Sequence, residues 1–127
     1  MIKILEKNPK LSLLIAILIA VIIFFMSSLT FPPSPPSFGS RPILYHFIIF
    51  FLFAFFLLIA ITKGDKNNFI YIGILIAIVY ALSDEFHQLF VPGRACAFSD
   101  FLVDSAGILF ASFLYILSIK LRKIKEV

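Results

Sequence analysis

Residues 11–29 of this chain read LSLLIAILIAVIIFFMSSL, an apolar run about as long as an α-helix needs to cross the hydrocarbon core of a membrane. Comparable runs follow at residues 43–62, 69–90 and 100–119. Because backbone polar groups in lipid must pair within their own segment, such runs are expected to be helical. The sequence therefore predicts an all-α membrane protein, a four-transmembrane-helix bundle that forms a single domain over residues 1–127.

The composition favours a lipid environment. Of the 127 residues, 61% are hydrophobic and only 14% are charged, which is more apolar surface than a soluble domain of this size can bury. The net charge of +4 comes from cations beside the apolar runs, so a lipid surface explains it better than nucleic acid does. The single cysteine, Cys96, excludes an intrachain disulfide and a thiolate zinc cluster. We expect the lipid bilayer as a partner, no nucleic acid, and no soluble cofactor.

The first apolar run resembles a signal peptide because lysines precede it, but it is long and Ser28-Leu29-Thr30 is a poor cleavage site. We therefore expect a retained helix. Residues 30–42 contain five prolines, which favours an extended, semi-rigid loop. Residues 63–68 form a short polar turn, so the second and third helices should be an antiparallel hairpin. Pro92-Gly93 should end the third helix, and Ser99 or Asp100 should cap the fourth.

The basic residues predict the orientation. The two tails and the second loop lie on one side of the predicted membrane, and the other two loops lie on the opposite side. The positive-inside rule then gives both termini in the cytoplasm of a multi-pass plasma-membrane protein. On the inner side lie Lys3, Lys7, Lys10, Lys63, Lys66, Lys120, Arg122, Lys123 and Lys125, against Arg41 and Arg94 outside.

Polar residues capable of chemistry collect at the outer ends of three helices, which random placement would rarely produce. On the third helix, four of them form one stripe at positions i, i+4, i+7 and i+8, while Glu85 is rotated about 100° away from Asp84. On the fourth helix, Gly107 and Ala111 continue the face of the two aspartates and should let a neighbouring helix approach closely. The stripe is Tyr80, Asp84, His87 and Gln88, and the other outer residues are His46, Arg94, Asp100 and Asp104.

Residues 83–94, SDEFHQLFVPGR, resemble the signature of the VanZ-like family. The resemblance implies a small membrane protein, and the namesake of that family is linked to low-level resistance to teicoplanin-type glycopeptides. His46-Phe47 is similar to the family's histidine on the second helix, although Pro42-Ile43 replace an expected Asp-Lys pair and Asp104 replaces an asparagine. The resemblance implies functional weight on Asp84, Glu85, His87, Gln88, Arg94 and Asp100.

The residues themselves leave several chemistries open. Asp84 and His87 are candidate catalytic residues for acid–base work, with His46, Glu85, Gln88, Arg94, Asp100 and Asp104 as candidate ligand-binding residues. Half of a metal site, completed by His46, Asp100 or Asp104, is an alternative, but with two histidines no metal is assigned. A third interpretation is a hydrogen-bonded network that locks the helices together. Arg94 suits an anion or a neighbouring acid, and Asp100 suits a helix cap equally well.

Three functions fit these patterns. The first is a cell-envelope protein whose outward pocket binds a lipid-linked or glycopeptide-type ligand and reduces teicoplanin susceptibility. The second is a membrane hydrolase or transferase that uses Asp84 and His87. The third is a structural subunit or a proton-linked transporter, and transport is disfavoured because the inner halves of the helices carry few polar residues. A thin four-helix bundle is compatible with a homodimer, but no motif specifies one.

Overall fold

The computed structural model describes residues 1–30, 40–65, 69–94 and 97–125, and every regular element in that part of the chain is helical. The four long helices are each long and apolar enough to cross a membrane, which confirms the predicted all-α class. Most of the proline-rich loop and Cys96 lie outside the described residues. The elements are α1 (Ile2–Lys7), α2 (Pro9–Ser27), α3 (Ser40–Thr62), α4 (Phe69–Gln88) and α5 (Phe98–Lys125).

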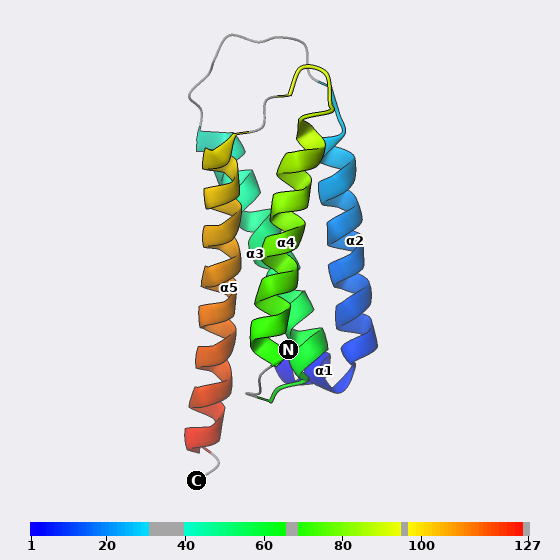
Figure 1. Ribbon diagram of the computed structural model, residues 1–127. Helices are drawn as coiled ribbons and strands as arrows, with labels where there is room; N and C mark the ends of the chain where they lie inside the picture. The colour runs from blue at the N-terminus through cyan, green and yellow to red at the C-terminus, as the bar shows by residue number, and fades with distance from the viewer. Residues whose placement is uncertain (31–39, 66–68, 95–96, 126–127) are drawn as a thin grey trace.

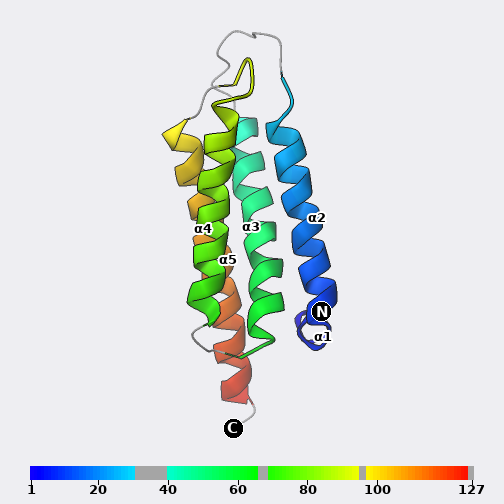
Figure 2. The same ribbon diagram turned by 45° about the vertical axis from the view of Figure 1, so that its right-hand side comes forward.

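The four long helices stand side by side, and α3 lies between α2 and α5 in both views (Figures 1 and 2). Its most extensive helix contact is with α5, and it also packs on α2 and α4. Both chain ends lie at one end of the bundle (Figure 1), here called the terminal pole. The opposite end, where α2 and α4 end and α3 and α5 begin, is called the loop pole.

Most helix boundaries differ from the sequence prediction: α2 is Pro9–Ser27 rather than 11–29, α4 ends at Gln88 rather than 90, and α3 and α5 are longer than expected. Helix α3 begins at Ser40, so the last residues of the expected loop are helical, and Pro42 falls in the first turn, where a missing amide hydrogen is tolerated. Helix α5 begins at Phe98 and runs to Lys125. The prediction that Ser99 or Asp100 caps this helix was wrong, because both lie inside its first turn. A basic last turn favours the longer helix because cations stabilise a helix C-terminus.

Helix α1 was not predicted, and a proline explains why it is separate from α2. Asn8 has φ −119° and ψ 65°, which lies outside the helical region. A residue before proline avoids the helical region because the proline ring would clash with it. Pro9 then opens α2, where proline is favoured. The buried Ser12 hydroxyl, on α2, donates to the Leu5 carbonyl, on α1, at 3.0 Å. This hydrogen bond gives the carbonyl a partner at the helix break and holds α1 against α2.

A glycine sets the distance between α3 and α5. A Cβ atom on Gly107 would lie 2.5 Å from the carbonyl oxygen of Phe47 and 3.2 Å from the backbone nitrogen of Phe51, so no other residue fits without moving the backbone. Ala111, one turn later, is fully buried in the core with Phe50. The small face predicted on the fourth helix is therefore confirmed, and it brings the two helices together near the loop pole.

A polar cluster ties the terminal pole together. Arg122 donates to both carboxylate oxygens of Glu6, at 2.6 Å each. The Tyr115 hydroxyl donates to Glu6 Oε1 at 3.1 Å and also lies 2.9 Å from the Thr62 hydroxyl. The Gly64 amide donates to the Tyr115 oxygen at 3.2 Å. We call Glu6, Thr62, Tyr115 and Arg122 the terminal cluster, and it joins α1, α3 and α5.

Candidate functional site

His46 and Asp104 form a buried pair at the loop pole. His46 lies on α3 directly before Phe47, whose carbonyl contacts Gly107, and Asp104 lies on α5 one turn before that glycine. The close approach therefore brings the two side chains together, with His46 Nδ1 2.9 Å from Asp104 Oδ1. Asp104 is fully buried. Its second oxygen, Oδ2, has no hydrogen-bond partner in the described part of the chain.

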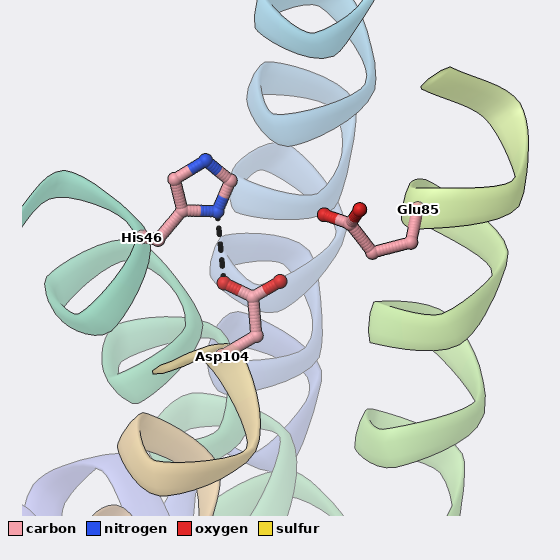
Figure 3. A group of neighbouring side chains, drawn as sticks. All are labelled: His46, Glu85 and Asp104. Carbon is pink, nitrogen blue, oxygen red and sulfur yellow. Dashed lines mark hydrogen bonds and ion pairs between the residues drawn. The ribbon is translucent and has the colours of Figure 1, made fainter. Parts of the chain in front are cut away.

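Glu85 reaches toward this pair from α4. Its side chain is 3% exposed, and its Oε2 accepts a hydrogen bond from the backbone amide of Ala97 at 3.2 Å, directly before α5. Its Oε1 is buried, and no described residue forms a hydrogen bond with it. In Figure 3 the carboxylates of Glu85 and Asp104 face each other across the space between α4 and α5, with the His46 ring above Asp104. The rotation that separates Glu85 from Asp84 thus directs Glu85 to α5.

Asp84 faces another side of the bundle. Its Oδ2 accepts a hydrogen bond from Gln88 Nε2 at 3.0 Å, and its Oδ1 is buried without a partner among the described residues. Both side chains line a pocket at the loop pole formed by α2, α3, α4 and the segment after α4. Sequence patterns did not reveal Met26 and Tyr45, because nothing distinguishes them from other apolar or interfacial residues. The pocket is lined by the apolar residues Ile23, Met26, Ile49 and Phe50 and by Ser27, Tyr45, His46, Asp84, Gln88 and Arg94.

His87 is directed toward α2. Its Nε2 lies 3.0 Å from the Ser28 hydroxyl, and its ring lies against Phe24 with a centroid distance of 4.6 Å. The Ser28 hydroxyl donates its only hydrogen to the Phe24 carbonyl at 2.7 Å, so His87 is the donor to Ser28. Within the described residues, no hydrogen bond joins His87 to Asp84. The acid–base role of Asp84 and His87 stays a prediction. In the described residues these two side chains do not orient each other through a hydrogen bond.

Arg94 and Asp100 lie beside the site in supporting positions. The Arg94 guanidinium donates to the carbonyls of Met26 at 2.7 Å and Leu29 at 3.3 Å, and so binds carbonyls at the C-terminal end of α2, where a cation is favoured. Asp100 lies in the first turn of α5 and accepts a long hydrogen bond of 3.4 Å from Ser99. An acid there is stabilised by the helix dipole.

One group of side chains has the composition of a metal site. His46, Glu85 and Asp104 each offer one ligand atom, and these atoms lie within 4.8 Å of one another. Each side chain comes from a different helix, α3, α4 and α5 respectively (Figure 3). Imidazole and carboxylate groups are common ligands of divalent transition metals. We call these three residues the His46 triad.

The sequence profile of the VanZ/LLP1 family matches residues 12–120. The chain belongs to the VanZ/LLP1 family. No curated protein and no solved structure showed a significant match to it. The matched residues include all the loop-pole residues described above, whereas Glu6 and Arg122 lie outside them. Family membership and four apolar helices make this VanZ/LLP1 chain a multi-pass membrane protein.

Sequence reasoning on the VanZ/LLP1 chain missed the terminal cluster. Glu6 stands in a tail rich in lysine, and the sequence analysis made no prediction for it. Its partner Arg122 is separated from it by 116 positions in the sequence, so no local pattern pairs them. The available signals were the apolar spacing of Ile2 and Leu5, which is typical of a short helix, and the break at Asn8-Pro9.

Proposed function

We propose that this VanZ/LLP1 protein acts in the cell envelope, where its loop pole binds a lipid-linked or glycopeptide-type ligand and lowers susceptibility to teicoplanin. One observation carries the proposal. Asp84 lines the pocket at the loop pole, which has a volume of about 20 Å³ and so has room for one water-sized group. Among the described residues its Oδ1 is a buried acceptor without a partner, and a single hydroxyl or amine of a ligand would satisfy it. A scaffold residue of this kind would normally be paired within the protein.

A second feature supports a lipid-linked ligand. The outer surface of α4 carries an apolar groove formed by Val79, Leu82, Phe86 and Leu89, with Glu85 at its side. These aliphatic and aromatic side chains are exposed, as expected for a helix that contacts lipid tails. An acyl chain held in this groove would place its polar head beside the loop-pole acids.

The proposed orientation puts the loop pole outside the cytoplasm, with both termini inside. It is supported by the basic residues, which are concentrated at the terminal pole and in its tails. In this orientation, a ligand of the outer leaflet or the envelope reaches the pocket without crossing the bilayer.

The test is expression in a teicoplanin-susceptible bacterium, with the minimum inhibitory concentration as the readout. The native chain is expected to raise this concentration, and Asp84→Asn, which keeps the shape but removes the charge, is expected to abolish the increase. Asp65→Asn is the matched control, because it removes an exposed carboxylate at the terminal pole. Membrane levels of all three proteins are compared by immunoblot.

Two results would contradict the proposal. If Asp84→Asn protects as well as the native chain, the pocket acid is structural. If the native chain gives no protection at a membrane level equal to that of the variants, the link to teicoplanin does not hold for this chain. His87→Gln in the same assay tests the acid–base prediction, since a hydrolase or transferase would lose all protection with it.

A further inference from the structure

We propose that the His46 triad binds one divalent transition-metal ion, with Zn²⁺ as the ion best suited to it. The site would lie inside the loop pole and bridge α3, α4 and α5. This inference goes beyond the proposed function and does not depend on a glycopeptide or lipid-linked ligand.

The arrangement of ligand atoms is the first argument. One ring nitrogen of His46 and one oxygen each of Glu85 and Asp104 lie within 4.8 Å of one another. Bonds from zinc to nitrogen and oxygen ligands are about 2.0–2.2 Å long, so two ligands of one ion lie at most about 4.4 Å apart. The three side chains therefore rotate inward to bind one ion together. In Figure 3 the two carboxylates point toward one another from opposite sides of that space.

The hydrogen bonds supply an independent second argument. Each carboxylate uses one oxygen within the protein: Asp104 Oδ1 pairs with His46, and Glu85 Oε2 accepts from the Ala97 amide. The other oxygen of each, Asp104 Oδ2 and Glu85 Oε1, is buried and has no hydrogen-bond partner among the residues that the structure describes. The two residues are 0% and 3% exposed, so water at the surface does not satisfy these atoms. A bound cation would satisfy both.

Charge indicates what kind of ion fits. Two buried carboxylates close together are costly in a low-dielectric interior unless a positive charge balances them. A divalent ion supplies two positive charges for two negative ones. Carboxylates alone would suit Mg²⁺ or Ca²⁺, but an imidazole ligand favours zinc and its neighbours in the first transition series.

The described residues provide three ligands in this group, which is the number typical of sites with an open position. The supporting structure is rigid. The contact between Gly107 and Phe47 fixes the backbone beside His46 and Asp104, and the Ala97 amide holds Glu85. Such outer contacts orient ligands and raise metal affinity. An open position at the loop pole would then be available to water or to an incoming ligand.

The experiment uses the full chain, purified in detergent through a tag without histidines and stripped of metal with a chelator. Binding of Zn²⁺, Mn²⁺ and Mg²⁺ is measured separately by equilibrium dialysis and elemental mass spectrometry. The native chain is expected to bind about one Zn²⁺ and to unfold at a higher temperature with it. Glu85→Gln and Asp104→Asn, which preserve side-chain shape, should each lower zinc affinity at least about tenfold.

Asp100→Asn is the matched control, since it removes a carboxylate from the same pole without changing a triad residue. It should bind zinc as the native chain does. Failure of the folded native chain to bind zinc or manganese overturns the proposal, as does binding of Mg²⁺ alone. Equal zinc binding by the native chain and both triad variants overturns it too. Zinc binding by the native chain is measured directly, so the proposal can be contradicted even if one variant fails to fold.

Discussion

The two poles of the bundle use similar residues in opposite ways. At the terminal pole, both oxygens of Glu6 accept hydrogen bonds from Arg122, and Tyr115 adds another. At the loop pole, Glu85 and Asp104 each keep one buried oxygen without a partner. Satisfied polar groups join helices, whereas unsatisfied buried ones cost free energy unless a ligand completes them. The difference fits a terminal cluster that stabilises the fold, and it is the basis for our proposal that the loop pole binds a ligand.

The largest effect is expected where the fold positions the loop pole. Gly107→Val should destabilise the protein by about 3 kcal/mol, because its Cβ would overlap the Phe47 carbonyl and force α3 and α5 apart. Separation of His46 from Asp104 should follow. The free energy of unfolding is measured by denaturant titration in mixed micelles.

Ala106→Val is the control for Gly107→Val, because Ala106 is exposed on the same helix. It should change the free energy of unfolding by less than about 1 kcal/mol. If both valine variants are equally stable, the close approach of α3 and α5 does not hold the loop pole together.

The same substitution at each pole tests the comparison directly. Glu6→Gln should lower the free energy of unfolding by about 1–2 kcal/mol, because it removes a charged acceptor of two hydrogen bonds from an arginine whose side chain is 25% exposed. Glu85→Gln in metal-free protein should leave stability unchanged or raise it, since it removes an unpaired buried charge. Equal destabilisation by both variants would show that the poles do not differ in this way.

A smaller effect is expected from acidification at the terminal pole. Hydrogen bonds from Arg122 hold the pKa of Glu6 below its ordinary value of 4.5. A lowered folded-state pKa contributes stability above about pH 4.5, and this stability is lost as the pH falls through the folded-state pKa. The difference in melting temperature between the native chain and Glu6→Gln should therefore shrink below about pH 4.5. A difference that stays constant down to about pH 3 would contradict this assignment.

The sequence was informative where the physics is local. Apolar runs of membrane-spanning length predicted the four long helices, and the Gly107–Ala111 face predicted a close helix approach. The residues at the loop pole were gathered correctly by depth, because rise per residue fixes depth along a helix. The rotation of each helix about its own axis, which decides the neighbour that each side chain faces, was harder to predict. Tyr80, Asp84, His87 and Gln88 share a broad stripe, yet Tyr80 and His87 bond to α2 while Asp84 and Gln88 bond to each other.

The side-chain partners and helix boundaries that were not predicted depend on contacts between segments distant in the sequence. Arg94 donates to the backbone carbonyls of Met26 and Leu29, at and just beyond the end of α2, and a backbone carbonyl has no signal in the sequence. The first turn of α5 begins earlier than predicted, because the acceptor for the Ala97 amide is a carboxylate on α4 rather than a neighbouring cap. Glu6 was overlooked for the same reason, since its environment is created by the last helix.

The pairing of Glu6 with Arg122 also has a consequence for synthesis on the ribosome. The two residues are 116 positions apart, so the first helices enter the bilayer well before the guanidinium that neutralises Glu6 has been made. Until α5 arrives, α1 cannot be fixed against the end of the bundle by this bond. The hydrogen bonds between Glu6 and Arg122 therefore form last during biosynthesis, after α5 has been translated.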